Sequence, residues 1–387
     1  MRQSLKITLY WLYPGCEQYN PTILLKSHRC YISATASEKG RTAIKQHILN
    51  GLYLSIAQTR RGTRVAVTPV VLGGSVVRLQ QTLANSVTCT GIGLHSGESV
   101  TMTLRPASPD TGVVFVNRNG HAGASLAASV EHLVPTELCT AISGNGFQVK
   151  TIEHVLAALA GMNVDNVYVD LDAGEAPVMD GSSAPFVRLI ESAGVVSQKK
   201  RQPYLKMTQS LEVVDGPRRI RIEPSATPRI TYSIQYDHPL IQTQTYSYEH
   251  STRAFSSDIA EARTFGFLQE VEALWARGLG RGGNLDNTVV LSKDGVLNES
   301  GLRFTNEFVR HKVLDLIGDF SLLGLPFIGH LIADRSGHAL HTKLVKQILN
   351  HPECWVLLNA DDSHAQSEPL PVMALPRSSS AVALHAS

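Results

Sequence analysis

Two segments of the chain have side chains whose types and spacing could bind a metal ion. His311 and Asp315 are four residues apart in a segment expected to be helical, so they would share one helix face. Glu153 and His154 are adjacent in a second, apolar helix, and they could approach one bound water from different sides. His154, His311 and Asp315 would supply two nitrogens and one carboxylate oxygen, which leaves a position open for water, as in catalytic zinc sites. Glu153 would then be placed to act as a general base on that water.

Each of these motifs also has a simpler structural explanation. A Glu-His pair on a helix surface is solvated in most proteins, although the apolar neighbours Leu156 and Leu159 make full exposure of this pair less natural. His311 and Asp315 could form an intrahelical pair with no metal at all. Only the combination of both motifs favours a shared metal site.

Two further segments could contribute to the same chemistry. His338 lies between an expected strand and an expected helix, where a loop histidine suits acid–base catalysis, although a surface histidine is the simpler explanation. Asp319 lies one turn beyond the metal-binding motif and would raise the pKa of His338 if it reached that ring. Thr264 precedes Phe265 and Phe267, so its hydroxyl could donate to an oxyanion beside an apolar slot, or the two rings could belong to an ordinary core.

The composition limits which classes of protein this chain can represent. It has 387 residues, which suggests two or three domains. With 35 Lys+Arg against 33 Asp+Glu, the net charge of +2 argues against a protein whose main role is to bind nucleic acid. The five cysteines are scattered without a C-x-x-C pair, which indicates a reducing compartment and makes a thiolate zinc site improbable. The sequence contains no apolar run of about 18 residues, so we expect no transmembrane segment.

Strands and helices are expected to alternate through both halves of the chain, from about Leu79 onward. Helices are expected at 151–162, 186–193, 267–277, 306–323 and 339–349, with strands before and between them. This order predicts an α+β fold with two similar domains, each a sheet layered with helices, and an active site at the domain interface. We place the domains at 79–198, with Glu153 and His154, and at 204–374, with the helix of His311 and Asp315 and the loop of His338. The polar, basic stretch 197–203 is the expected linker, and 375–387 is a tail.

Residues 1–78 differ from the rest of the chain. Basic residues are frequent there and the acidic ones are only Glu17 and Glu38, with no sustained hydrophobic period. Three interpretations compete: a transit-like leader, a disordered basic arm, or a mis-assigned start in which upstream DNA has been translated and the true initiator lies near Val76, Val77 or Leu79. None of them assigns chemistry to this segment.

Six motifs, in this order, resemble those of the zinc-dependent UDP-3-O-acyl-N-acetylglucosamine deacetylases, the LpxC family of lipid A biosynthesis. The resemblance extends roughly from Leu79 to Ala374, and it is specific because all six occur together. The motifs are Gly93-Leu-His-Ser-Gly97, Thr151-Ile-Glu-His154, Pro177-Val-Met-Asp-Gly-Ser-Ser-Ala-Pro-Phe186, Ala262-Arg-Thr-Phe-Gly-Phe267, Val309-Arg-His-Lys-Val-Leu-Asp-Leu-Ile-Gly-Asp319 and Ser336-Gly-His-Ala-Leu340.

The resemblance implies a role for each matching residue. The metal, one Zn²⁺ per chain with Fe²⁺ as a possible substitute, would bind His154, His311 and Asp315. Glu153 would be the general base, and His338 the acid, oriented and charged by Asp319. The remaining roles go to Thr264 at the oxyanion, Lys312 near the substrate diphosphate, Phe265 and Phe267 near the substrate cleft, and a β-α-β insert over about 267–288 that forms a passage for the acyl chain. His341 and Thr342 replace an asparagine pair common in the family, a departure that could affect loop packing but should not remove the acid.

The implied reaction is hydrolysis of the acetamide of UDP-3-O-acyl-N-acetylglucosamine to the free amine and acetate. The implied setting is the cytoplasm of a bacterium, or an organellar matrix if residues 1–78 are a transit peptide, and the protein is expected to be a monomer. Two alternatives stay open: another zinc amidase or peptidase, although the sequence has no H-E-x-x-H, and a non-catalytic sugar-nucleotide-binding relative.

Overall fold

The structure is a computed structural model that describes residues 78–119 and 124–358, together with the backbone of four short strands before them. Those strands form two antiparallel pairs, β1 (Thr22–Lys26) with β2 (Arg29–Ser33) and β3 (Lys45–Leu49) with β4 (Leu52–Ile56). The expectations for the rest of 1–77, for 359–374 and for the tail 375–387 lie outside the described residues.

The body of the protein begins one residue earlier than expected. The guanidinium of Arg78 donates to both carboxylate oxygens of Asp165, at 2.5 and 2.7 Å. Arg78 therefore belongs to the folded body rather than to the N-terminal extension, because a bidentate pair of this kind fixes its side chain.

The first large sheet has the strand order β6-β7-β13-β8-β9. All neighbouring pairs are antiparallel except β13 with β8. The predicted alternation of β7 is confirmed, because Val100, Met102 and Leu104 are buried while their neighbours are not. The strands are β6 (Val87–Ile92), β7 (Ser99–Pro106), β8 (Val113–Asn117), β9 (Ser125–Ala127) and β13 (Val167–Leu171).

The second large sheet repeats this plan. Its order is β16-β17-β23-β18-β19, and again only the third and fourth strands, β23 and β18, run parallel. In both sheets the central strand, β13 or β23, is the one that comes last in the sequence. The strands are β16 (Leu211–Asp215), β17 (Arg218–Glu223), β18 (Arg229–Gln235), β19 (Thr243–Glu249) and β23 (His330–Asp334).

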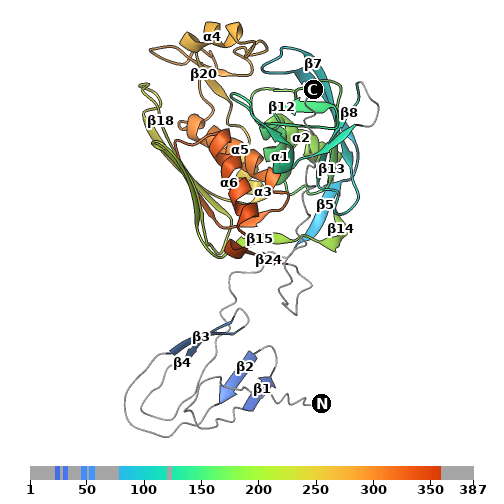
Figure 1. Ribbon diagram of the computed structural model, residues 1–387, viewed down its shortest axis with the longest axis vertical. Helices are drawn as coiled ribbons and strands as arrows, with labels where there is room; N and C mark the ends of the chain where they lie inside the picture. Colours follow the sequence, from blue (N-terminus) through green and yellow to red (C-terminus); the bar gives the residue numbers. More distant parts are fainter. Residues whose placement is uncertain are drawn as a thin grey trace, which may run out of the picture.

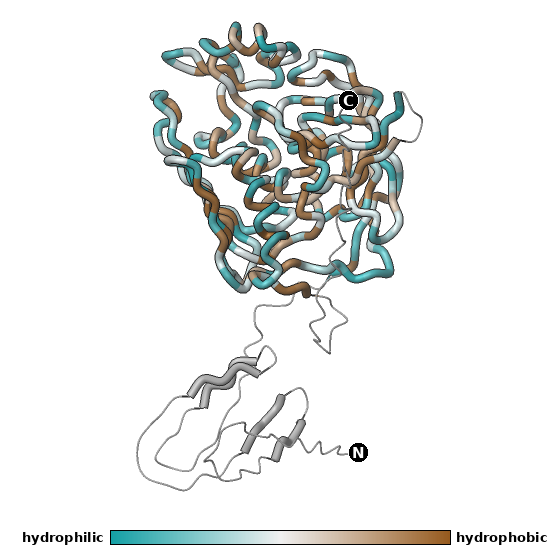
Figure 2. Tube along the Cα trace, viewed as in Figure 1, coloured by the Kyte–Doolittle hydropathy of each residue, from teal (hydrophilic) through white to brown (hydrophobic). Residues whose placement is uncertain are grey.

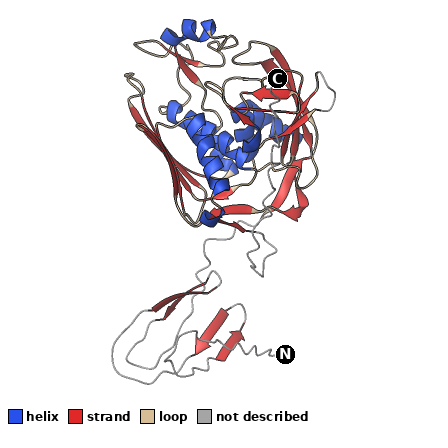
Figure 3. Cartoon of the chain, viewed as in Figure 1, coloured by secondary structure: helices blue, strands red, loops and turns tan. Residues whose placement is uncertain are grey.

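Four helices lie between the two sheets (Figures 1 and 3). They are α1 (Glu153–Gly161), α2 (Ala184–Ala193), α5 (Glu307–Phe320) and α6 (His338–Asn350), followed after α5 by the 3₁₀ turn η4 (Ser321–Leu323). The mixed α+β class is therefore confirmed, and the four helices match the predicted segments to within two or three residues at most ends. Helices in the described part of the chain are all too short or too polar to cross a lipid bilayer.

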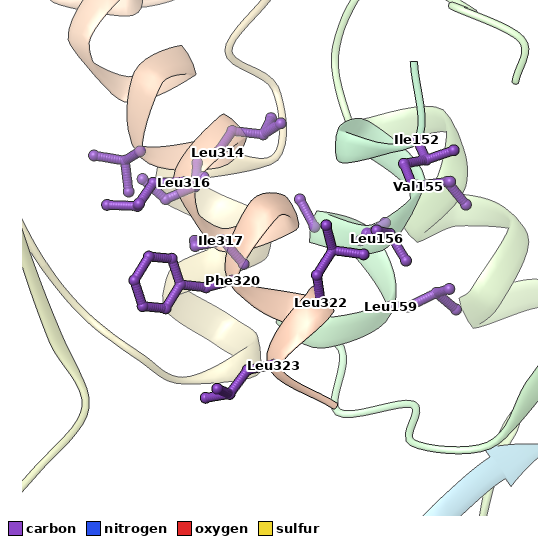
Figure 4. Close-up of a cluster of buried hydrophobic side chains, with 14 of the residues drawn as sticks. Ile152, Val155, Leu156, Leu159, Leu314, Leu316, Ile317, Phe320, Leu322 and Leu323 are labelled. Atoms are coloured by element: carbon purple, nitrogen blue, oxygen red, sulfur yellow. The ribbon is translucent and has the colours of Figure 1, made fainter. Parts of the chain in front are cut away.

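Helices α1 and α5 approach each other very closely. A Cβ built on Gly318 would stand 2.0 Å from the carbonyl oxygen of Glu153, so only glycine fits at this crossing. Around the crossing, apolar side chains of α1, α5 and η4 form one cluster, and Leu156, Leu314 and Leu322 are among its fully buried members (Figure 4). Burial of each large apolar side chain contributes about 1.5–3 kcal/mol to the free energy of folding. In Figure 2, apolar stretches of the chain follow these inner elements.

Smaller sheets complete the body. The predicted linker 197–203 is wrong, because most of it belongs to β14 (Val195–Arg201), which pairs antiparallel with β5 (Leu79–Leu83). A two-stranded ribbon leaves most polar side chains of β14 exposed. The composition of β14 therefore resembles that of a linker. The other small sheets contain β10 (Leu133–Val134), β11 (Ala141–Gly144) and β12 (Phe147–Lys150), and β15 (Tyr204–Met207), β22 (Phe327–Ile328) and β24 (Trp355–Leu358).

The expected β-α-β insert is present, with wider bounds than predicted. β20 (Phe265–Phe267) and β21 (Val289–Leu291) pair in parallel, and α4 (Val271–Ala276) lies between them. The helix starts four residues later than predicted because Phe267 is extended, with φ −99° and ψ 129°. The remaining short elements are α3 (Thr252–Ala254), the π-helical turn η2 (Phe255–Ile259), and the 3₁₀ turns η1 (Val130–His132), η3 (Leu268–Glu270) and η5 (Pro352–Cys354).

Candidate active site

The close crossing of α1 and α5 brings together the three predicted metal ligands. His154 lies in the first turn of α1, while His311 and Asp315 lie one turn apart on α5. All three side chains are buried, with 2–4% of their surface exposed. Residues more than 150 positions apart therefore share one interior site because Gly318 lets the two helix backbones touch.

The donor atoms converge on one carboxylate oxygen. Asp315 Oδ1 is 3.3 Å from His311 Nε2 and 3.7 Å from His154 Nε2, and the two imidazole rings stand edge to face, with centroids 5.0 Å apart. Ligands that each sit about 2.0–2.2 Å from one tetrahedral ion are separated by roughly 3.3–3.6 Å. The observed separations fit a single shared divalent ion.

The protonation states suit metal binding as well. His311 Nδ1 donates to the carbonyl of Ala262 at 3.0 Å, which leaves Nε2 with its free lone pair. Burial lowers the pKa of His311 to about 3, so its imidazole is neutral. Burial opposes the charge of Asp315, but the ammonium of Lys312 holds the pKa of its carboxyl well below the usual range. His154 faces Asp315 through Nε2, and its other ring nitrogen, Nδ1, is buried without a hydrogen-bond partner among the described residues.

Glu153 is positioned beside the three ligands. Its carboxylate is buried, and Oε2 accepts a hydrogen bond from the backbone N–H of Thr140 at 3.0 Å. Oε1 lies 4.0 Å from His338 Nε2. Burial raises the pKa of Glu153, while His338 and His154 oppose that rise. A carboxylate with a raised pKa next to a metal site is the group expected of a general base.

His338 and Asp319 form a charged pair that faces Glu153. His338 is the first residue of α6, not the loop residue that was predicted, and its Nδ1 lies 2.8 Å from Asp319 Oδ2. Burial works against a charged ring, but Asp319 raises the pKa of His338 to about 9. Burial likewise works against the charge of Asp319, yet the pKa of its carboxyl is lowered to about 2 by His338 and His341. His338 is therefore an imidazolium at neutral pH and can donate a proton from Nε2.

Lys312 and the two phenylalanines lie next to the ligands. The ammonium of Lys312 is 2.7 Å from Asp315 Oδ2 and 5.7 Å from the centre of the Phe265 ring. Burial disfavours its charge, but Asp315 raises its pKa above the ordinary value. Phe265 and Phe267 are half-buried and pack against Tyr236. The backbone N–H of Thr264 donates to the carbonyl of Gly181, and its carbonyl accepts from the N–H of Val289.

Two polar residues at this site had not been singled out for catalysis from the sequence. Thr140 donates from Oγ1 to Asp319 Oδ1 at 2.5 Å and lies 3.2 Å from His338 Nδ1. His341 is fully buried, and its Nδ1 donates to Asp319 Oδ2 at 2.7 Å. His341 is a helical residue in direct contact with Asp319, so its role goes beyond the loop packing that the sequence suggested, while His338 keeps its own contact with Asp319. Its place three positions after His338 was the available signal, whereas nothing in the spacing of Thr140 pointed to Asp319.

Asp319, His338 and His341 also form a cluster of potential ligands. Both Nδ1 atoms lie at 2.7–2.8 Å from the same oxygen, which is the length of a charge-assisted hydrogen bond. This cluster is therefore a hydrogen-bonded group and not a second metal site. Cys139 is buried and its pKa is raised to about 12 by burial, so it is not a nucleophile.

A cavity of about 1160 Å³ is lined in part by the C-terminal portions of α1 and α5. Leu156, Leu159, Ile317 and Phe320 form part of its wall. None of the described metal-site, acid or base residues lines it.

Sequence comparison finds a matching family and several relatives of known name. Residues 80–350 match the family described as "LpxC: UDP-3-O-acyl N-acetylglycosamine deacetylase". A protein of Syntrophotalea carbinolica named UDP-3-O-acyl-N-acetylglucosamine deacetylase is 46% identical over 284 residues, which cover 73% of this chain and 92% of the relative. Proteins with the same name from Myxococcus xanthus and Geobacter sp. are 46% and 47% identical, over 73% and 72% of this chain and 90% and 92% of their own lengths.

Proposed function

The chain belongs to the UDP-3-O-acyl-N-acetylglucosamine deacetylase family, and on that premise we propose how its residues perform the reaction. The substrate is UDP-3-O-acyl-N-acetylglucosamine, and hydrolysis of its acetamide yields the free amine and acetate, a step of lipid A biosynthesis. The observation that supports this most directly is the buried set of His154, His311 and Asp315 beside the facing pair Glu153 and His338.

The metal is Zn²⁺, with Fe²⁺ able to occupy the same ligands. Two imidazoles and one carboxylate are the donors expected of a catalytic zinc site, and they leave room for a fourth ligand. A divalent ion bound by these three residues would polarise a water and the amide carbonyl and would lower the pKa of that water.

The protein groups move the protons. Glu153 accepts a proton from the attacking water through Oε1, the carboxylate oxygen that its backbone partner leaves free. His338 gives its Nε2 proton to the departing nitrogen, while Asp319 holds Nδ1. The hydroxyl of Thr264 donates to the oxyanion as the carbonyl becomes tetrahedral. One water is consumed, its proton reaches the amine through the two side chains, and acetate is released.

The substrate spans two different surfaces. Lys312 has donors beyond the one engaged by Asp315, and these bind the diphosphate. Phe265 and Phe267 line the start of an apolar path along the β-α-β insert, where Leu268 and Trp275 are exposed to 49% and 54%. Exposed large apolar side chains at such a place suit an acyl chain better than water.

We further propose that 79–198 and 204–374 are two domains of common origin, with the active site between them. The identical strand order and direction of the two five-stranded sheets support this division. Glu153 lies in the first half of the folded body and His338 in the second, which also supports it. The nucleotide-sugar substrate suggests a cytoplasmic setting, and a monomer supplies every group that the mechanism uses.

The test is acetate release by the purified full-length chain. The acetylated sugar nucleotide should yield one amine per acetate, measured by mass spectrometry, whereas N-acetylated peptides should not react. Turnover of peptides instead would indicate another amidase. Binding of the sugar nucleotide without any acetate release by the metal-loaded protein would indicate a non-catalytic relative.

A further inference from the structure

Thr140 contacts the acid and the base of the site at the same time. It directly precedes β11 and is 2% exposed. Its backbone N–H donates to Glu153 Oε2 at 3.0 Å, and its hydroxyl donates to Asp319 Oδ1 at 2.5 Å. The same hydroxyl oxygen lies 3.2 Å from His338 Nδ1. Three elements, α1, α5 and α6, therefore meet at one residue.

The hydrogen-bond capacity of a hydroxyl settles the direction of these contacts. Thr140 has a single O–H proton, and the carboxylate of Asp319 can only accept it. The hydroxyl oxygen is then left as an acceptor for the Nδ1–H of His338, which it shares with Asp319 Oδ2. With its Nδ1 proton held from two sides, the His338 ring keeps Nε2 directed at Glu153 Oε1 across the 4.0 Å gap.

We infer that Thr140 is a positioning residue that fixes the orientation of His338 relative to Glu153. The inference rests on the proposed deacetylase function and extends it. The backbone contact holds Glu153 and survives any side-chain change, so the side chain itself acts on Asp319 and His338. Loss of the hydroxyl should therefore misplace the proton donor and leave the metal site and substrate binding intact.

The backbone around Thr140 does not depend on its hydroxyl. The carbonyl of Thr140 accepts from the N–H of Ile152 at 3.3 Å, and the preceding carbonyl, that of Cys139, accepts from the hydroxyl of Thr136 at 2.6 Å. Val has nearly the shape of Thr without its polar atom. We therefore expect Thr140→Val to remove the hydroxyl donor of Asp319 and to keep the fold and the backbone contact to Glu153.

The experiment compares Thr140→Val, Thr140→Ser and a control in the full-length, metal-loaded enzyme. Thr82→Val is a matched control, because Thr82 is also buried and its hydroxyl donates to the carbonyl of Asn166, away from the site. For Thr140→Val we expect kcat and kcat/KM to fall together by roughly 10- to 100-fold, the usual effect of losing such a supporting contact, with KM and metal content unchanged. Thr140→Ser should recover most of kcat, and Thr82→Val should behave as wild type in kcat.

Several outcomes would overturn the inference. These are a Thr140→Val enzyme within twofold of wild type in kcat, a loss confined to KM, or a Thr140→Ser enzyme no faster than Thr140→Val. If Thr140→Val does not fold, Thr140→Ala is judged by the same criteria, and failure of both to fold shows a purely structural role. Absence of acetate release by the wild-type enzyme would instead refute the proposed function, so the two failures are distinguishable.

Discussion

Replacement of Asp319 by asparagine should shift the pH range in which the enzyme works. Asp319 is fully buried and accepts hydrogen bonds from Thr140, His338 and His341. Burial opposes a charged His338, but Asp319 makes the largest of the contributions that raise its pKa from 6.5 to about 9, ahead of Asp315 and Glu153. A rise of this size corresponds to roughly 3 kcal/mol of preferential stabilisation of the imidazolium. Because burial opposes a charged ring, the pKa of His338 should return to its ordinary value or lower in Asp319→Asn.

The sign of the effect follows from the role of His338 as an acid. A proton donor is active below its pKa, so the wild-type enzyme should lose kcat/KM as the pH rises through about 9. In Asp319→Asn this basic limb should move to about pH 6.5 or below. At pH 7.5 the protonated fraction of His338 then falls from nearly all to about a tenth, which alone predicts a loss of about tenfold, and misorientation of the ring adds to it.

The assay is kcat/KM for acetate release between about pH 5.5 and 10, with metal content measured on each sample. Asp170→Asn is a suitable control, because Asp170 is also buried and pairs with Arg105, within the first large sheet. A basic limb that stays near pH 9 in Asp319→Asn would refute the assignment of His338 as the acid charged by Asp319. An equal shift in Asp170→Asn would show that the effect is global.

Three other changes test the metal, the base and the helix crossing. Acetate release should be abolished both by removal of the metal with a chelator and by His311→Ala. Added Zn²⁺ should restore activity to the chelated wild type but not to His311→Ala. A metal-free preparation that is fully active would contradict the metal site. Glu153→Gln should lower kcat by roughly 10²- to 10⁴-fold with metal content unchanged, and deacetylation at the wild-type rate would refute its role as base. Gly318→Ala should lower the free energy of unfolding by about 1–3 kcal/mol in a denaturant titration, because its Cβ would meet the Glu153 carbonyl, whereas Gly295→Ala has open space and should be neutral.

Much of the fold could be predicted because its local signals are strong. The alternation of Val100, Met102 and Leu104 specified β7, and the apolar periodicity around Leu156 specified α1. The errors occurred where local composition and structure diverge. The polar stretch 197–203 is mostly an exposed strand, since a two-stranded ribbon buries few side chains, and Phe267 ends a strand where a helix had been predicted.

Residue types and short spacings by themselves indicated the candidate metal donors of this protein. His311 and Asp315 share a helix face because the helix repeats every 3.6 residues, and Glu153 is covalently next to His154. Only the tertiary structure decided which residues meet across the chain. Thr140 reaches Asp319 across 179 positions because α1 and α5 cross in contact at Gly318. Such a contact depends on the packing of whole elements, which no periodicity in the sequence records.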